Sequence, residues 1–393
     1  MRTAAYAIPL AGLLALSLAG CAGMGESLST GFGLWGSKDT TETPAPLPEL
    51  KQSLAVKIQW QAAMGAAGDY VFTPVLEGGS VYAAGAGAIA RFDADSGKPL
   101  WRVETGKKLS AAVGVGEGMV LAATPKGEVL AYDLDGKALW QAKVSSEVLS
   151  APQAAEGIVV VRSVDGRIFG LSAGDGKRRW VYQGPMPSLA IRGYAGVVLK
   201  RGAVFAGYAG GKLVALSLAN GNLGWEASVA QPRGSSELER IADVTSMPVL
   251  DDKRICAVAY QGRVACFEVL NGNLVWAREM SSISGLTLDQ SGMYVSDAKG
   301  AVHALDKNSG ASIWKQDKLL NRRLSAPLAR GKYLAVGDLE GQVHFLSRED
   351  GSFVARVATD GSAIGAPPLA LGPDLLVQTR NGGMFALSSA EFR

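Results

Sequence analysis

One short pattern returns along almost the whole chain at intervals of about 40 residues. It consists of a glycine, a run of alternating apolar residues that ends in a polar one, a turn that ends in glycine, and a tryptophan. Complete copies occupy residues 87–101, 127–140, 166–180, 211–225, 262–276 and 300–314. A seventh copy, 341–355, has Ala355 where tryptophan is expected, and an eighth, 382–388, stops before its tryptophan. A period of this length indicates a small unit that must stack on its neighbours to bury its apolar faces.

Each unit has room for four short antiparallel strands joined by tight turns. The high glycine content, 50 of 393 residues, fits a chain with many such turns. The last unit lacks its final strand, and residues 57–60 (KIQW) near the other end of the chain have the form of that strand. We therefore predict an all-β, eight-bladed β-propeller, closed into a ring by an N-terminal strand that completes the last blade.

The repeated tryptophans are expected to lie between adjacent blades, where a large aromatic side chain buries the most apolar surface. They are Trp60, Trp101, Trp140, Trp180, Trp225, Trp276 and Trp314.

The N-terminus has the layout of a secretion signal: Arg2, an apolar run over residues 4–18, and a small-residue exit. The following residues, LAGC at 18–21, resemble a bacterial lipobox, in which Cys21 is acylated and becomes the mature N-terminus. Ala22 is not aspartate, so the usual sorting pattern of such lipoproteins implies the outer membrane. The alternative is an ordinary signal peptide followed by an incidental cysteine. We predict a lipoprotein signal peptide over 1–20, a lipidated flexible tether over 21–50, and the propeller over 51–393.

Composition excludes several classes of function. The net charge is only +3, which gives no electrostatic case for binding nucleic acid. The chain has two histidines and three cysteines, no adjacent cysteines, and none of the Gly-rich phosphate, GxSxG or HExxH motifs. Asp93, Asp133 and Asp306 occupy a repeat position that holds serine elsewhere, which indicates hydrogen bonding in turns and not catalysis. We expect no enzyme, no metal and no cofactor.

His303 and His344 occupy a repeat position that is otherwise apolar in most copies. We expect core histidines that are hydrogen-bonded to the backbone. A zinc site is not indicated, because no further ligand types cluster with them.

Cys256 and Cys266 lie on the two arms of one predicted hairpin around residues 260–262. A two-residue loop would place the sulfurs on opposite faces of the hairpin, whereas a three-residue loop would place the two cysteines directly opposite each other. The sequence therefore does not decide whether Cys256 and Cys266 form a disulfide.

Two intervals between tryptophans are long, 45 and 51 residues, because extra residues follow Trp180 and Trp225. These insertions, 182–193 and 230–248, occupy equivalent places in consecutive blades and must emerge side by side on one rim. They are either tolerated surface loops or a binding patch. Leu189, Ile191 and Arg192 favour the patch, because apolar residues beside an arginine are typical of interface centres.

The repeat resembles the pyrroloquinoline-quinone-type, or tryptophan-docking, propeller family, which contains both quinoprotein dehydrogenases and non-enzymatic scaffolds. With the lipobox and the two insertions, the chain is closely similar to the outer-membrane protein assembly factor B family, most densely over residues 234–250, 259–276 and 322–355. That family carries a Leu-x-Leu-Arg-Gly segment, which corresponds to residues 189–193 with Ile191 in place of the second leucine. Its Asp-Val-Asp segment corresponds to Asp243, Val244 and Thr245, so that Thr245 departs from the family's second aspartate.

The resemblance implies a non-enzymatic scaffold lipoprotein on the periplasmic face of the outer membrane, within the β-barrel assembly machinery. Leu189, Ile191, Arg192 and Asp243 would contact a POTRA domain of the central barrel subunit. Unfolded outer-membrane proteins are further expected partners, through pairing with exposed outer strands of the blades. The alternative function is a periplasmic quinoprotein dehydrogenase or ligand-binding propeller.

Overall fold

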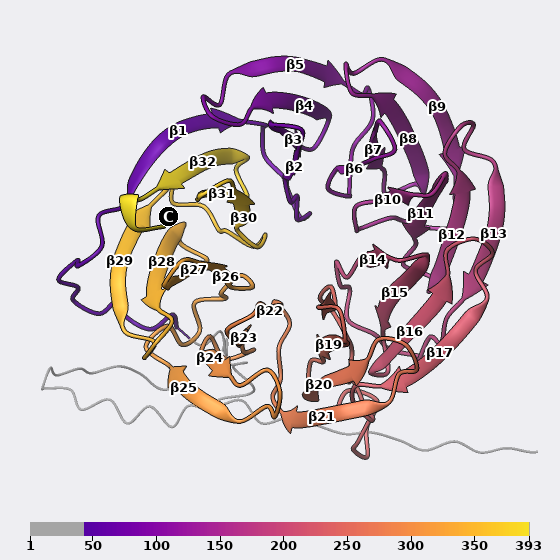
Figure 1. Cartoon of the computed structure of the whole chain (residues 1–393). Coiled ribbons are helices and arrows are strands. Elements are labelled where there is room, and N and C mark those ends of the chain that lie inside the picture. Colours follow the sequence, from indigo (N-terminus) through magenta and orange to yellow (C-terminus); the bar gives the residue numbers. More distant parts are fainter. Residues whose placement is uncertain (1–42, 393) are drawn as a thin grey trace, which may run out of the picture. The chain divides into compact units, whose positions relative to one another are not determined.

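A computed structural model of the chain describes residues 43–392, which form one compact unit. Figure 1 shows eight four-stranded antiparallel sheets arranged in a ring. In seven of them the strands follow the chain from the innermost to the outermost, whereas in the eighth the N-terminal strand is outermost. The predicted signal peptide, Cys21 and the tether up to residue 42 lie outside the described residues. In residues 43–392 no helix is long and apolar enough to cross a membrane.

The first four blades follow one another along the chain. Blade 1 contains β2 (Val75–Glu77), β3 (Ser80–Ala84), β4 (Ala88–Asp93) and β5 (Pro99–Glu104). Blade 2 contains β6 (Gly114–Gly116), β7 (Met119–Ala123), β8 (Glu128–Asp133) and β9 (Ala138–Lys143). Blade 3 contains β10 (Gln153–Ala155), β11 (Ile158–Arg162), β12 (Arg167–Ser172) and β13 (Arg178–Gln183). Blade 4 contains β14 (Val197–Lys200), β15 (Ala203–Tyr208), β16 (Lys212–Ser217) and β17 (Leu223–Ser228).

The second half of the ring has the same arrangement. Blade 5 contains β18 (Val249–Leu250), β19 (Arg254–Val258), β20 (Arg263–Glu268) and β21 (Leu274–Glu279). Blade 6 contains β22 (Gly285–Leu288), β23 (Met293–Ser296), β24 (Val302–Leu305) and β25 (Ser312–Gln316). Blade 7 contains β26 (Leu328–Arg330), β27 (Tyr333–Gly337), β28 (Gln342–Ser347) and β29 (Phe353–Ala358). Blade 8 contains β30 (Leu369–Leu371), β31 (Asp374–Gln378), β32 (Gly383–Ser388) and, as its outer strand, β1 (Lys57–Ala63); a short 3-10 helix, Ala390–Phe392, follows β32.

The ring closes as predicted. Strand β1 pairs antiparallel with β32, with Trp60 opposite Ala386. The all-β, eight-bladed propeller with four antiparallel strands per blade is confirmed, and closure joins the two ends of the domain in one sheet.

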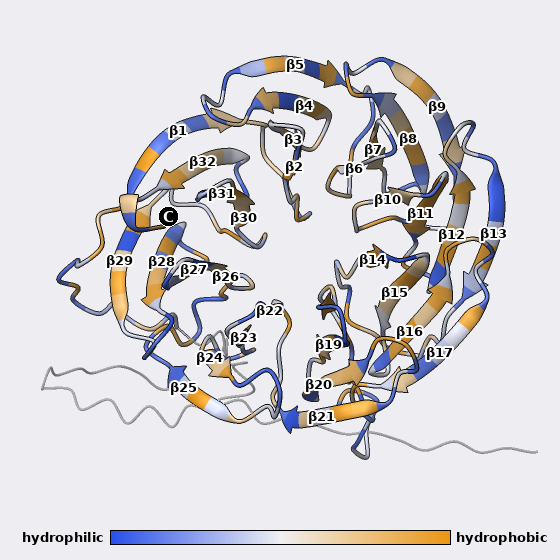
Figure 2. Ribbon diagram, in the orientation of Figure 1, coloured by the Kyte–Doolittle hydropathy of each residue, from blue (hydrophilic) through white to orange (hydrophobic). Residues whose placement is uncertain are grey.

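Burial explains the residue pattern of each strand. The middle strands are covered on both faces by neighbouring blades, so β7 is buried at every position. The outer strands are less buried and mix apolar with polar residues, as the changing colours along β5 and β25 show in Figure 2. The core is therefore a set of apolar layers between the blades.

The tryptophans dock each blade onto the next. The indole N–H of Trp60 in blade 8 donates to the carbonyl of Ala94 in blade 1 at 3.0 Å, and its ring lies against Gly97. Gly97 has a φ of +67°, and a Cβ there would lie 2.5 Å from the Trp60 ring. Glycine is thus required both by the backbone and by the ring that covers it. The same bond to a carbonyl of the following blade is made by Trp101, Trp140, Trp180, Trp225, Trp276 and Trp314.

The junction of blades 7 and 8, where Ala355 replaces tryptophan, is filled by residues from both ends of the domain. Phe392 stacks on Phe345 with ring centroids 5.6 Å apart, and Leu54 is fully buried in the same apolar cluster as Ala355. The amides of Ser53 and Leu54 donate to the carbonyl of Val354. Chain ends therefore substitute for the missing indole.

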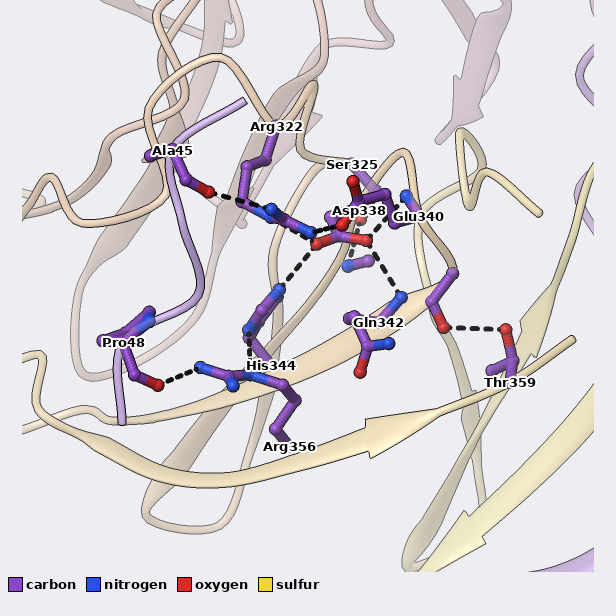
Figure 3. A network of polar contacts seen from close by, with 12 residues as sticks. Ala45, Pro48, Arg322, Ser325, Asp338, Glu340, Gln342, His344, Arg356 and Thr359 are labelled. Carbon is purple, nitrogen blue, oxygen red and sulfur yellow. Dashed lines mark hydrogen bonds and ion pairs between the residues drawn. The ribbon is translucent and has the colours of Figure 1, made fainter. Parts of the chain in front are cut away.

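Residues 43–50, which we assigned to the tether, contact blades 6 and 7. The amide of Ala45 donates to the carbonyl of Leu320 at 2.9 Å, and Leu47 packs on the apolar cluster between these blades. Figure 3 shows Arg322 and Arg356 donating to the carbonyls of Ala45 and Pro48. This part of the chain packs against the ring before the predicted boundary at residue 51.

The hairpin of blade 5 resolves the cysteine question. Ala259 and Arg263 are hydrogen-bonded across a three-residue turn, so that Cys256 lies opposite Cys266 and the two form a disulfide. The left-handed residue in this turn is Gln261, with a φ of 48°. The three-residue alternative is therefore the one that the chain adopts.

Candidate docking site

The two insertions emerge on the same rim of blades 3 to 5 and touch each other. The first is the rim loop, residues 184–196, which joins β13 to β14; the second insertion, residues 229–248, joins β17 to β18. Asp243 of the second insertion accepts a hydrogen bond from the amide of Ile191 in the rim loop at 2.7 Å. The predicted residues are thus brought together in one place.

Asp243 is a buried positioning residue and is not part of the exposed surface. Its side chain is inaccessible, with the residue 2% exposed, and its second carboxylate oxygen accepts from the amide of Gly210 at 2.9 Å. A carboxylate that receives two backbone amides fixes the conformation of the loops that supply them. In the free chain Asp243 therefore lies beneath the exposed residues of the rim loop.

Thr245, where the resembled family has aspartate, is also buried. Its hydroxyl donates to the carbonyl of Ile283 at 2.9 Å. An ionised carboxylate has no proton to donate, so threonine suits this contact. The departure from the family pattern is accommodated inside the loop structure.

Arg192 and Leu189 face outward from the rim loop. The Arg192 side chain is 48% exposed, donates to Glu147 at 2.7 Å, and lies over the Tyr70 ring at 5.4 Å. The hydrogen bond to Glu147 holds the pKa of the Arg192 guanidinium above its usual value. Leu189 is 40% exposed, whereas Ile191 is half-buried. The loop therefore presents one oriented cation beside one exposed aliphatic side chain.

A cavity of about 390 Å³ lies beneath the rim loop. Three exposed apolar residues, Val164, Met186 and Leu189, line it, and so does the partly buried Arg162. Two further exposed apolar residues, Met247 and Ile283, lie on the neighbouring connections of the same rim. A clustered apolar surface with an arginine is typical of a protein–protein contact.

The histidines are core residues, but our expected partner was wrong. His303 bonds to the carboxylate of Asp297, and His344 to that of Asp338, both at 2.9 Å, and not to the backbone. Burial lowers the pKa of His344 despite the bond to Asp338. In residues 43–392 no three His, Cys, Asp or Glu side chains are grouped so that they could hold a metal ion.

The aspartates of the repeat hold turns, as predicted. Asp93 accepts from the amide of Ser96, Asp133 from that of Lys137, and Asp306 from that of Ser309. Hydrogen bonds from the side chain and amide of Ser309 lower the pKa of Asp306.

Sequence reasoning missed three residues of the rim: Glu147, Tyr70 and Arg162. Glu147 and Tyr70 lie on connections between blades that are not lengthened. They come close to Arg192 only because the ring is closed. Arg162 ends a regular strand of the repeat, and no signal in the repeat separates it from neighbouring polar residues.

The ring and its rim define a tryptophan-docking β-propeller whose distinctive surface is suited to holding another protein. A family model described as outer membrane protein assembly factor BamB matches residues 85–316 and 298–391. The chain belongs to this family.

Individual relatives agree. An outer membrane protein assembly factor BamB from Bordetella pertussis is 42% identical over 380 residues, which cover 96% of this chain and 95% of that protein. The crystal structure of BamB from Moraxella catarrhalis matches with a TM-score of 0.79 at 25% identity, covering 85% of this chain and all of that one. A quinohemoprotein alcohol dehydrogenase from Comamonas testosteroni shares the fold alone, with a TM-score of 0.69 at 13% identity over 84% of this chain and 76% of that one. The family's name describes an assembly factor and not an enzyme, in agreement with our expectation.

Proposed function

We propose that this chain is a non-enzymatic scaffold of the outer-membrane β-barrel assembly machinery, whose rim loop docks a POTRA domain of the central barrel subunit. The relatives' names, which describe outer membrane protein assembly factors, support the general role. The observation that carries the docking surface is the rim loop itself, with Leu189 and Arg192 exposed while Asp243 fixes the backbone beneath them. Such pre-organisation reduces the entropy lost on binding.

Arg192→Glu should abolish co-purification with the barrel subunit while leaving the propeller folded. The variant places a second carboxylate beside Glu147 and removes the exposed cation, so we expect an affinity loss of about 30-fold or more. Pull-down from detergent-solubilised outer membranes measures the effect, and circular dichroism verifies the fold. Leu189→Ala should also weaken binding, but without the salt dependence of the arginine contact.

Arg201→Glu is the matched control. Arg201 is also an exposed arginine in an ion pair, with Asp252, but it lies in the turn between β14 and β15 at the opposite rim. Co-purification should survive this change. Normal co-purification of a folded Arg192→Glu protein would move the docking site away from the rim loop.

The membrane contact of the scaffold is proposed to be a lipid on Cys21, on the periplasmic face of the outer membrane. More than one acyl chain gives stable anchoring, so Cys21→Ala should leave the propeller folded but soluble in the periplasm. Fractionation of cells that lack the barrel-subunit contact, through Arg192→Glu in the same chain, checks this. Recovery of the double variant in the outer-membrane fraction would refute the anchor.

A second contact, with unfolded outer-membrane protein substrates, is favoured by the outer strands. Leu100, Leu139, Leu274 and Ile313 are exposed on the last strands of four blades, whose outer edges pair with no further strand in residues 43–392. Such edges can accept an extended chain by β-augmentation. A photo-crosslinker at position 274 should capture nascent substrate during assembly, whereas one at position 201 should not; equal yields would contradict this role.

A further inference from the structure

A partly buried arginine lies beneath the rim loop without an anionic partner. Arg162 is the last residue of β11, at the junction of blades 3 and 4, and its guanidinium covers the ring of Tyr208 at 4.8 Å. One N–H donates to the carbonyl of Ala195 at 3.0 Å. The residue lines the cavity of about 390 Å³ under the loop.

The carboxylates around this cavity are already engaged. Glu147 pairs with Arg192, and Asp243 accepts two backbone amides. In the adjoining turn Asp165 pairs with Arg167 and accepts from two serine hydroxyls. Among residues 43–392, Arg162 therefore forms no ion pair.

An uncompensated cation in such a place is unfavourable in the free protein. The loss of water around the partly buried guanidinium lowers the pKa of Arg162, because desolvation disfavours the charged form. A carboxylate that enters the cavity would relieve this cost and could accept two parallel N–H donors, a geometry for which arginine is well suited.

We propose that the cavity under the rim loop accepts the carboxylate of an aspartate or glutamate side chain from the docked partner, bound by Arg162. This inference rests on the proposed function. The exposed edge of Val164, Met186 and Leu189 suits an acidic residue that is flanked by apolar ones. Arg162 is thus a specificity-determining residue inside the docking surface, whereas Arg192 acts at its exposed rim.

The test measures binding of a purified POTRA fragment of the barrel subunit to the mature lipidated chain in detergent. Arg162→Gln should weaken binding about 30-fold or more, because the partner's carboxylate would be buried without its cation. The melting temperature of the free variant should stay nearly unchanged, because glutamine can still donate to the carbonyl of Ala195 and a partly desolvated charge without an ion pair has been removed. A purely structural role for Arg162 would lower it. Arg167→Gln, an exposed arginine of the same hairpin, is the control and should bind normally.

A double-mutant cycle identifies the partner's residue. One Asp→Ala or Glu→Ala change in the POTRA fragment should cost as much as Arg162→Gln and should cost little more when both are combined. If Arg192→Glu abolishes binding while Arg162→Gln binds normally, the docking surface stands and this inference fails. If neither variant weakens binding, both fail. If sodium glutarate raises the melting temperature only when Arg162 is present, and POTRA binding ignores Arg162, the cavity is a site for free anions and the inference is overturned.

Discussion

Trp60→Ala should lower the free energy of unfolding by about 3–5 kcal/mol, the range observed when a large aromatic side chain is removed from a core. Trp60 is buried, donates its indole N–H to the carbonyl of Ala94, and covers Gly97 of blade 1. Its strand, β1, also closes the ring through β32. The substitution therefore opens a cavity between blade 1 and blade 8, the blade whose sheet joins the two ends of the domain.

Thermal and urea unfolding of the purified chain measure the effect, with an expected fall in melting temperature of roughly 4–7 °C. Ile58→Ala provides a matched control, because Ile58 lies on the same strand but is exposed. Surface changes of this kind usually stay within about 0.5 kcal/mol. A Trp60→Ala midpoint equal to that of the control would contradict closure through this tryptophan.

The ring could be predicted from the sequence because its determinants are local and repeated. Each glycine and tryptophan recurs at a nearly constant interval, and the same contact, such as that of Trp60 with Gly97, is made at each tryptophan-bearing junction. The closing strand was found because the last copy lacks one. Because the contact between blades repeats, the regular spacing of glycine and tryptophan along the sequence is enough to predict it.

The junction without tryptophan could not be predicted in the same way. Ala355 signals only that an indole is missing, whereas Leu54 and Phe392 fill the space from segments outside the repeat. The disulfide could not be predicted from the repeat either. The register of one hairpin, whose turn contains the left-handed Gln261, decides whether Cys256 faces Cys266. Neither feature has a periodic signature.

The sequence predicts which rim carries the proposed docking surface, but not the role of each residue in it. The lengthened intervals placed two insertions on one rim, and the structure brings them into contact through Asp243 and Ile191. Burial separates Asp243 from Arg192, and burial in an insertion depends on how two loops pack against the finished ring. Arg162 could not be identified from the sequence for the same reason, because its surroundings come from three different connections between blades.

Asp338→Ala should destabilise the chain by about 3–5 kcal/mol, because it removes the buried partner of Arg322 and leaves that arginine only its ion pair with the exposed Glu340. Asp338 and Arg322 are both buried and paired at 2.7 Å, and His344 donates to the same carboxylate oxygen. Figure 3 shows that Arg322 also reaches the carbonyl of Ala45. The variant should therefore loosen residues 43–50 as well, which hydrogen exchange of that segment would detect.

The pH dependence of stability distinguishes the two titrating groups of this network. Nδ1 of His344 accepts from Arg356, so Nε2 carries the proton and the imidazole is neutral. Burial lowers the pKa of His344, so below about pH 6.5 the unfolded chain takes up a proton that the folded chain does not, and stability falls as the pH falls. Burial alone would raise the pKa of Asp338, but hydrogen bonds from His344, the Gln342 amide and Arg322 lower it, so a second loss begins below about pH 4.

His344→Gln should remove the first loss and keep the second. A glutamine side chain can donate to Asp338 through its amide nitrogen and accept from Arg356 through its oxygen, as the neutral imidazole does, but it does not titrate. Urea unfolding at a series of pH values from about 7 to about 3 measures both slopes. An unchanged slope between pH 6.5 and 5 in His344→Gln would show that the acid sensitivity comes from another group. If the slope disappears, the acid sensitivity comes from His344, the buried imidazole that bridges Asp338 and Arg356. Arg356 in turn binds the carbonyl of Pro48 in the segment that precedes β1.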